Sequence, residues 1–355
     1  MLKDRRSRLI PFFEHDNLDC ILIEHAPNLR YLSGFSGSEG TLLLTREEGW
    51  FVCDSRYTLQ ANEELSGVSL LEHGRPVEAI TALCAEKKWR RIGFEAAHTT
   101  VADHQGMVST LTGSELVPLG VELDNIRNCK DQSELDCLER AAILASESLK
   151  AVLPQIRNGL SESEFAVALE FEMRRRGADG RGFDFIVASG ERGAMPHGRA
   201  TSKKFSNGEL VTIDYGVVLD GYHSDETVTI CIGQPDSRQI EIYDVVKSAH
   251  DLAISSIKPS VSCRSVDALA RNYIRDKGFG AYFGHGLGHG LGLEIHEKPV
   301  LSPRSDAVLE QGMVVTVEPG IYIPGWGGIR IEDTVVVTED GCQILTAVSK
   351  EMIVV

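Results

Sequence analysis

Two stretches in the C-terminal part of the chain repeat one pattern of strand residues and carboxylates. The first reads VTIDYG at residues 211–216 and, after a short turn, SDETVT at residues 224–229. The second reads VTVEPG at residues 315–320 and, after a longer turn, IEDTVV at residues 331–336. Each stretch predicts a β-hairpin with two acids, so four carboxylates are expected on a duplicated strand framework.

Side-chain alternation along these strands places the acids on polar faces. Residues two apart on a strand share a side, so Asp214 lies beside Thr212 and Glu318 beside Thr316. Burying a face of acids is unfavourable unless cations neutralise it. The alternative is that the acids lie on an outer face of the sheet, where water solvates them. The matched positions in two hairpins favour a metal site, with four candidate ligands: Asp214, Asp225, Glu318 and Glu332.

A glycine-rich run lies between the hairpins and reads GHGLGHGLG at residues 284–292. His285 and His289 have the spacing of a helical zinc pair, but five glycines in nine residues disfavour a helix. The run also lacks the Lys-Ser/Thr of a phosphate-binding P-loop and the spacing of a dinucleotide fingerprint. We expect the glycines to let the backbone approach a crowded centre, where a histidine joins the acids.

The charge of this set indicates the kind of metal. Four carboxylates balance two divalent cations, and two-metal sites use bridging carboxylates to hold ions about 3.5–4 Å apart. Four acids and one imidazole form a hard, oxygen-rich set that suits Mn²⁺ or Co²⁺ better than structural zinc. Magnesium is less suitable because it dehydrates reluctantly. We therefore expect two divalent ions, Mn²⁺ or Co²⁺, with Zn²⁺ as the remaining possibility.

Composition excludes several other classes of protein. The 355 residues include 52 acidic and 36 basic side chains, and the formal charge of -16 argues against nucleic acid or anionic membranes as partners. No stretch approaches the roughly 18 apolar residues of a membrane helix, and no signal peptide is recognisable. The eight scattered cysteines form no Cys-x-x-Cys pair. We expect them to be free thiols of a cytoplasmic protein.

The order of expected elements divides the chain in two. Residues 1–124 predict a mixed α/β domain, with strands at 20–23, 40–44, 50–53 and 91–94 and a helix at 77–88. Residues 125–355 predict an α+β domain in which two helices and then strands occur twice around an antiparallel sheet. The first of its expected helices begins at the capping-box acid Asp131 and ends before Pro154. The other three span 161–177, 240–257 and 266–277.

Several short motifs together resemble the pita-bread metallopeptidases, the family of prolidase, aminopeptidase P and methionine aminopeptidase. They are IDYG at 213–216, GLGHGLG at 286–292, EPGIY at 318–322 and GIRIEDT at 328–334, and the loop from Ser189-Gly190 to Pro196-His197 also fits. The first third resembles the creatinase/prolidase N-terminal domain through NLRYLSG at 28–34 and DSRY at 54–57. Methionine aminopeptidases lack that domain, so the resemblance implies the Xaa-Pro branch. Creatinase shares the fold but has lost the metal ligands, which are all present here.

The resemblance implies a ligand role for five side chains. Asp214 would chelate one ion, His289 and Glu318 would bind the other, and Asp225 and Glu332 would bridge the two. A metal-bridging hydroxide would then attack the carbonyl that precedes proline, since coordination lowers the pKa of water.

Further roles follow from the same resemblance. Glu318 would accept the proton of the attacking water as general base. His197 and His296 would stabilise the tetrahedral intermediate or carry a proton to the leaving proline nitrogen. Substrate contacts would come from His285, in the proline pocket, and from Tyr322 and Arg330, which would orient ligands or substrate.

Two positions stand apart from this pattern. The family often has arginine where this chain has Val228, but strand parity points that side chain away from the acids, so we expect a packing difference without loss of activity. His223 shares strand parity with Asp225 and is a candidate neighbour of the site.

The resemblance thus implies a homodimeric Xaa-Pro peptidase, and the scattered cysteines add the expectation that it is cytoplasmic. It would be either a proline dipeptidase or an Xaa-Pro aminopeptidase, and its partners would be proline-containing dipeptides or short peptides. Two alternatives stay open: an aminopeptidase of broader specificity on the same fold, and a catalytically silent member that binds peptides.

Overall fold

The computed structural model describes residues 2–355, which form two compact units with a boundary between Arg127 and Asn128. The domain boundary expected from the sequence falls three residues earlier, inside the 3₁₀ helix η1 (Val121–Arg127) that ends the first unit. Among the described residues no helix has the length and apolarity needed to cross a membrane. The eight cysteines are all free thiols.

The first unit is a mixed α/β domain around one six-stranded sheet of order β4-β3-β2-β1-β5-β6. β1 pairs antiparallel with β2 and parallel with β5, so the sheet has both kinds of ladder. Its strands are β1 (Cys20–Ile23), β2 (Thr41–Leu44), β3 (Gly49–Cys53), β4 (Ser69–Glu72), β5 (Arg91–Glu95) and β6 (Glu115–Leu119). Its helices are α1 (Leu2–Ser7), α2 (Ile10–His15), α3 (Ala26–Ser33), α4 (Thr58–Glu64), α5 (Pro76–Lys87) and α6 (Val101–Thr110). The four strands and the helix expected from apolar runs are present within one residue of their predicted ends.

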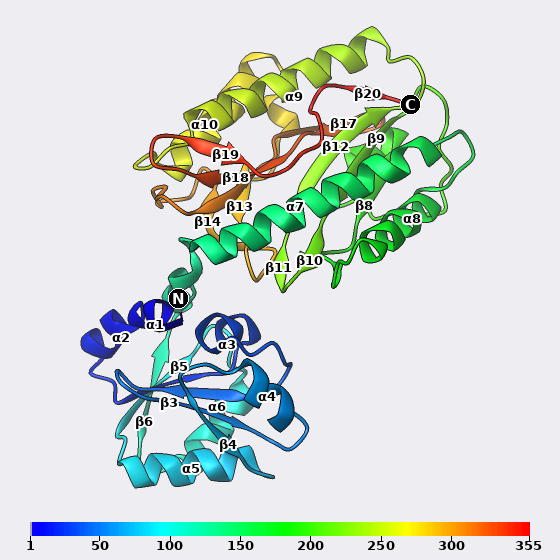
Figure 1. Ribbon diagram of the computed structural model, residues 1–355. Helices are drawn as coiled ribbons and strands as arrows, with labels where there is room; N and C mark the ends of the chain where they lie inside the picture. Colours follow the sequence, from blue (N-terminus) through cyan, green and yellow to red (C-terminus); the bar gives the residue numbers. More distant parts are fainter. Residues whose placement is uncertain (1) are drawn as a thin grey trace. The chain divides into compact units, whose positions relative to one another are not determined.

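The second unit contains two pairs of helices, and each pair precedes a set of strands (Figure 1). The helices are α7 (Gln132–Val152), α8 (Glu162–Arg175), α9 (Ser237–Ser256) and α10 (Cys263–Asp276), with 3₁₀ turns η2 (Leu153–Gln155), η3 (Gly190–Ala194) and η4 (Gly280–Tyr282). Capping boxes at Asp131 and Ser161 begin α7 and α8 as predicted. α9 and α10 each begin three residues before the predicted start, because the caps Asp236 and Ser262 were not recognised.

The strands of the second unit form two main sheets and two small ones. The four-stranded sheet has the order β20-β12-β9-β8 and the five-stranded sheet has the order β14-β13-β15-β18-β19. The first set of strands is β7 (Gly180–Arg181), β8 (Ile186–Ser189), β9 (Leu210–Tyr215), β10 (Val217–Leu219), β11 (Tyr222–His223) and β12 (Glu226–Cys231). The second set is β13 (Gly288–Gly290), β14 (Glu297–Leu301), β15 (Val314–Val317), β16 (Gly320–Ile323), β17 (Gly327–Arg330), β18 (Asp333–Val337), β19 (Cys342–Ile344) and β20 (Ile353–Val354). All pairs in this unit are antiparallel except β12 with β20.

Each half of this unit buries its own core. Side chains of α7 and α8, such as Leu149 and Phe165, pack with Ile213 and Val228 of the first sheet. α9 and α10 pack with the second sheet through a separate cluster that includes Val246, Val315 and Val335. The predicted αα-ββ duplication is therefore confirmed, and Val228 lies on the apolar face as strand parity required.

Candidate metal centre

The two hairpins of the duplication bring the four acids together. In the first, β9 pairs with β12 so that Asp214 lies opposite Thr227. In the second, β15 pairs with β18 so that Thr316 lies opposite Thr334. Only Asp214 is within a strand, because Asp225 and Glu332 immediately precede β12 and β18 and Glu318 follows β15. The acids thus occupy strand ends, where the backbone leaves the ladder and the side chains can converge.

Distances confirm the convergence. Carboxylate oxygens of Asp214, Asp225 and Glu332 all lie within 4.8 Å of one another. His289 Nε2 lies 3.5 Å from Asp225 Oδ2 and 3.5 Å from Glu318 Oε1. The five side chains predicted as metal ligands therefore form one cluster.

The glycine-rich run carries His289 into this cluster on β13. A Cβ atom on Gly288 would lie 2.0 Å from the Thr316 carbonyl oxygen, and one on Gly290 would lie 2.3 Å from that of Lys298. Only glycine permits β13 to lie this close to its two neighbours, which confirms the expectation of a crowded centre.

The orientation of His289 suits a metal ligand. Its Nδ1 lies 3.0 Å from the Gly290 carbonyl oxygen, which can only accept, so Nδ1 carries the proton and Nε2 has the lone pair toward the acids. Burial lowers the pKa of His289 to about 4, so the ring is neutral at pH 7.

A chain of hydrogen bonds connects Asp214 to His285. Arg330 donates from Nη2 to Asp214 Oδ2 at 2.6 Å and from Nη1 to the Tyr322 hydroxyl at 2.9 Å. The hydroxyl lies 3.0 Å from His285 Nε2, and His285 Nδ1 lies 2.7 Å from the Gly286 carbonyl oxygen. The proton is therefore on Nδ1, and Tyr322 donates to Nε2, which fixes the orientation of both side chains.

Burial and mutual repulsion disfavour ionisation of the acids. Burial raises the pKa of Asp214, although Arg330 offsets part of the effect. Burial raises the pKa of Glu318 to about 8, and burial together with the neighbouring carboxylates raises the pKa values of Asp225 and Glu332 well above their usual range. Full ionisation of the four acids would give a net anionic cluster even with Arg330 beside it, so without cations the acids retain protons at neutral pH.

The donor set fits divalent cations. Asp214 Oδ1 is buried and, among the described residues, accepts no hydrogen bond, whereas its Oδ2 is held by Arg330. Cations would supply the partner that this oxygen lacks and the charge that the cluster needs. Asp214, Asp225, His289, Glu318 and Glu332 are the residues that would hold them.

Two cavities meet at this cluster. The larger, of about 380 Å³, has apolar walls from Phe183, Ile186 and Ile295. The smaller, of about 220 Å³, is bounded by His285, Val300 and Tyr322. Asp214, His289, Glu318 and His197 line both. Sequence reasoning missed the apolar walls, although Ile295 directly precedes a candidate histidine.

The remaining candidate histidines have different positions. His197 is exposed and lines both cavities, and His296 lines the larger one with its ring centroid 4.5 Å from that of His289. His223 lines neither cavity, and its backbone N–H donates to the carbonyl oxygen of Gly292, the last residue of the glycine-rich run that carries His289.

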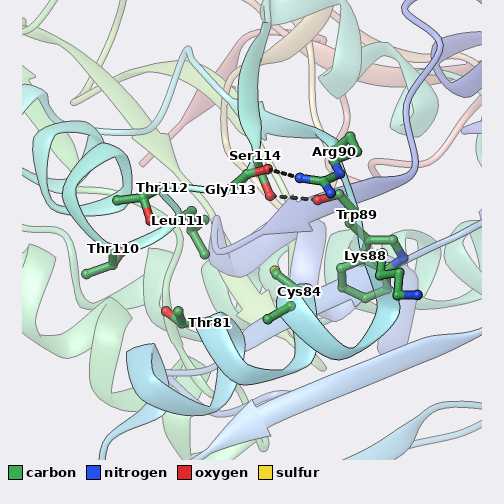
Figure 2. Close-up of a pocket in the computed structure, with 11 residues that line it drawn as sticks. Thr81, Cys84, Lys88, Trp89, Arg90, Thr110, Leu111, Thr112, Gly113 and Ser114 are labelled. Carbon is green, nitrogen blue, oxygen red and sulfur yellow. Dashed lines mark hydrogen bonds between the residues drawn. The ribbon is translucent and has the colours of Figure 1, made fainter.

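The first unit has a hollow of about 350 Å³ between α5 and α6, which Figure 2 shows. Arg90 donates to the Gly113 carbonyl and Ser114 to that of Trp89, so the polar groups at its edge are bonded to backbone. Burial raises the pKa of Cys84 to about 11, which leaves an unreactive thiol. No acid or histidine is among the described residues that line it, so the hollow offers no metal ligands.

A second group of possible ligands in the first unit is His25, His98 and Asp124. The two imidazole rings stack at 3.5 Å with an interplanar angle of 6°, and His98 Nε2 lies 2.9 Å from Asp124 Oδ2. Stacked rings direct their nitrogen lone pairs in parallel planes, so this geometry does not converge on one ion.

Lys350, which sequence reasoning did not single out, supports the strands behind the cluster. Glu226 and Asp333 each follow a predicted bridging acid and point to the other side. Lys350 Nζ lies 2.6 Å from Glu226 Oε1 and 3.2 Å from Asp333 Oδ1, and all three side chains are less than a tenth exposed. One cation thus connects the two halves of the duplication.

Replacing Lys350 by methionine is expected to lower the free energy of unfolding by about 3 kcal/mol, because the buried carboxylate of Glu226 loses its cation and that of Asp333 keeps only His250. Urea unfolding of the metal-free protein measures this change. Lys247→Met is the matched control: it removes exposed pairs to Asp251 and Glu351 and should change stability by less than about 1 kcal/mol. Equal effects of the two substitutions would contradict the role of Lys350.

Comparison with known proteins gives one consistent result. The profile of metallopeptidase family M24 matches residues 136–339, and that of the creatinase/prolidase N-terminal domain matches residues 5–129. An uncharacterized peptidase of Bacillus subtilis is 43% identical over 98% of this chain and 99% of its own. A solved Xaa-Pro dipeptidase from Bacillus anthracis is 40% identical over the full length of both chains, with a TM-score of 0.97. An X-Pro aminopeptidase structure from Thermotoga maritima is 35% identical, covers 96% of this chain and 99% of its own, and has a TM-score of 0.92.

Proposed function

The chain belongs to metallopeptidase family M24, and on that premise we propose that it is a two-metal Xaa-Pro peptidase that cleaves the bond before proline. The observation that carries the proposal is the cluster of five ligand-type side chains at the junction of two cavities. The relatives named Xaa-Pro dipeptidase and X-Pro aminopeptidase support this choice of substrate.

The family implies divalent metal ions, and we propose Mn²⁺ or Co²⁺, with Zn²⁺ as the alternative. Asp214, Asp225, His289, Glu318 and Glu332 would hold the ions: Asp214 would serve one ion, His289 and Glu318 the other, and Asp225 and Glu332 would be shared between them. This assignment agrees with the lone pair of His289 Nε2 and with the free Oδ1 of Asp214 among the described residues. Divalent ions held there would supply Lewis-acid chemistry: they would lower the pKa of water toward neutrality and polarise the substrate carbonyl.

The side chains around the ligands provide positioning and proton transfer. Glu318 accepts the proton of the attacking water, a role that its place in both cavities allows. His197 and His296 face the same space and donate to the developing oxyanion or move a proton to the leaving proline nitrogen. Arg330 orients Asp214 through the 2.6 Å ion pair.

The two cavities determine the orientation in which the substrate binds. The smaller, bounded by His285, Val300 and Tyr322, takes the compact proline ring. The larger, with Phe183, Ile186 and Ile295, takes the residue before proline and favours an apolar side chain there. The scissile bond then lies at the shared residues Asp214, His289 and Glu318.

A peptide panel tests the proposal. Purified protein loaded with Mn²⁺ or Co²⁺ is expected to cleave Xaa-Pro dipeptides, and faster than Xaa-Pro-Xaa tripeptides. Faster cleavage of the tripeptides would identify an Xaa-Pro aminopeptidase, and equal cleavage of Ala-Xaa or Met-Xaa peptides would identify the broader specificity. Absence of hydrolysis with every peptide, despite bound metal, would contradict the proposed function and leave the peptide-binding alternative.

We also propose a homodimer in a reducing compartment. The dimer follows from the family resemblance alone, and the eight free thiols support the compartment.

A further inference from the structure

The loop that carries His197, here called the His197 loop and defined as residues 189–201, is fixed at both ends. It leaves β8 at Ser189, passes through η3 and presents Pro196 and His197 to the smaller cavity. Both ends of the loop meet Glu162, the first residue of α8, whose side chain is fully buried.

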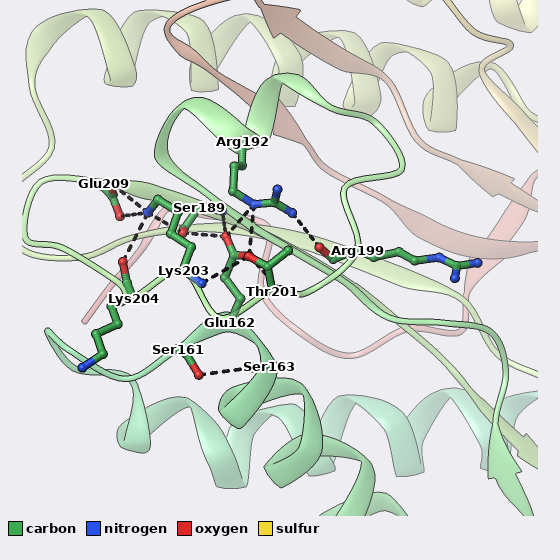
Figure 3. Close-up of polar contacts among 10 residues, drawn as sticks. All are labelled: Ser161, Glu162, Ser163, Ser189, Arg192, Arg199, Thr201, Lys203, Lys204 and Glu209. Atoms are coloured by element: carbon green, nitrogen blue, oxygen red, sulfur yellow. Dashed lines mark hydrogen bonds and ion pairs between the residues drawn. The ribbon is translucent and has the colours of Figure 1, made fainter.

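Each carboxylate oxygen of Glu162 serves a different end of the loop (Figure 3). Oε1 accepts from the backbone N–H of Ser189 at 2.9 Å and from its hydroxyl at 2.8 Å. Oε2 accepts from the backbone N–H of Thr201 at 3.0 Å and from its hydroxyl at 2.7 Å. Arg192 Nε lies 3.3 and 3.1 Å from the two oxygens, and its Nη2 donates to the Arg199 carbonyl at 2.6 Å. The Glu162 carboxylate therefore binds both ends of the loop, and Arg192, bound to the same carboxylate, also holds the loop backbone at Arg199.

The loop is also in direct contact with the strand that carries Arg330. A Cβ atom on Gly193 would lie 2.8 Å from the Gly328 backbone nitrogen, so the two backbones touch with no side chain between them. The Pro196 carbonyl accepts from Arg330 Nη1 at 3.1 Å, and the same guanidinium holds Asp214. A shift of the loop would therefore move His197 relative to the predicted metal ligands.

Helix capping does not account for Glu162. The first turn of α8 already has a capping box, in which the Ser161 hydroxyl accepts from the Glu164 N–H and the Glu164 carboxylate accepts from the Ser161 N–H. Glu162 instead directs its carboxylate to groups of the His197 loop.

We propose that Glu162 is a positioning residue for His197: it closes the loop at both ends and so sets the place of the imidazole over the junction of the cavities. This inference rests on the proposed function, because His197 acts in the reaction only if the chain is a peptidase.

Glu162→Gln tests the proposal with almost no change in shape. The amide presents one oxygen and one NH₂ group, so one end of the loop loses its acceptor and faces a donor instead. We expect kcat for an Xaa-Pro dipeptide to fall about 10²-fold, the scale associated with a displacement near 1 Å, with little change in KM or in metal content. Glu164→Gln is the matched control, since it weakens the capping box of the same helix and should lower Tm without lowering kcat.

A double-substitution cycle with His197→Ala separates positioning from a general loss of structure. If Glu162 acts through His197, Glu162→Gln should lower kcat far less in the His197→Ala background than in the wild type. An undiminished further loss in that background, or a wild-type kcat in Glu162→Gln alone, would overturn the proposal. Should Glu162→Gln fail to fold, Thr201→Val removes one hydroxyl donor from Oε2 and should show a smaller loss with the same non-additivity.

Amide hydrogen exchange provides a readout that needs no activity. Residues 190–200 should lose protection in Glu162→Gln and keep it in Glu164→Gln. Unchanged protection in Glu162→Gln would overturn the proposal even if the wild-type protein cleaves no Xaa-Pro peptide, and lost protection would support loop closure in that case. Failure of the proposed function is thereby distinguished from failure of this inference.

Discussion

Glu318→Gln is expected to lower kcat for an Xaa-Pro dipeptide by about 10³-fold while the protein keeps its fold. Glutamine has the size of glutamate and can keep the contact with the Thr316 hydroxyl, 3.4 Å away, but it cannot accept a proton from water. The substitution also removes one of four buried acids that repel one another, so the metal-free protein should not lose stability.

The measurement must separate proton transfer from ligation, because Glu318 is also a predicted ligand of the ion bound by His289. Activity is therefore measured across increasing Mn²⁺ up to saturation, with bound metal quantified in the same samples. The exposed Glu310 provides the matched control, since Glu310→Gln removes the same charge on the surface. Recovery of wild-type kcat in Glu318→Gln at saturating Mn²⁺ would reduce Glu318 to a ligand and refute its role as general base.

Sequence patterns predicted the local elements well because their causes are local. Apolar runs such as 20–23 and 50–53 predict buried strands, and the capping boxes at Asp131 and Ser161 predict helix starts. The starts of α9 and α10 were missed although Asp236 and Ser262 have the same chemistry, because the polar first turn after each cap gives no apolar period. Strand parity also placed Val228 correctly, since alternation depends on the backbone alone.

The cluster itself was predictable only in part. Parity identified the polar faces of Asp214 and Glu318, but the contact of Thr227 with Glu332 depends on how two hairpins meet across more than 100 residues. Glu162 and Lys350 were hidden for the same reason. The sequence places Glu162 only within an expected helix at 161–177 and gives no signal for Lys350, because the groups that each contacts are distant in sequence. Periodicity therefore shows which side of an element is polar, whereas tertiary packing decides which polar groups meet.

Metal removal should abolish hydrolysis and make stability fall with pH. In the metal-free protein the pKa of Glu318 is about 8, against 4.5 for an ordinary glutamate, and burial and neighbouring carboxylates raise the pKa values of Asp225 and Glu332 as well. Through these acids the folded protein binds more protons than the unfolded chain up to about pH 8. The lowered pKa values of His285 and His289 have the opposite effect, but only below 6.5, the ordinary pKa of histidine, so the free energy of unfolding decreases as pH rises from 6.5 to 8. Bound Mn²⁺ requires the ionised acids, so the stability gained from the metal should increase over the same range.

Thermal unfolding of chelator-treated protein between pH 6.5 and 8.5, with and without Mn²⁺, measures both trends. The metal-free protein should lose Tm as pH rises, and the shift in Tm caused by Mn²⁺ should grow. Glu318→Gln is the internal control, because glutamine does not titrate: its metal-free form should show a weaker decrease of Tm with pH than the wild type. A shift in Tm caused by Mn²⁺ that stays constant or shrinks as pH rises would mean that the acids are already ionised without metal. That result would contradict their raised pKa values and the release of protons on metal binding.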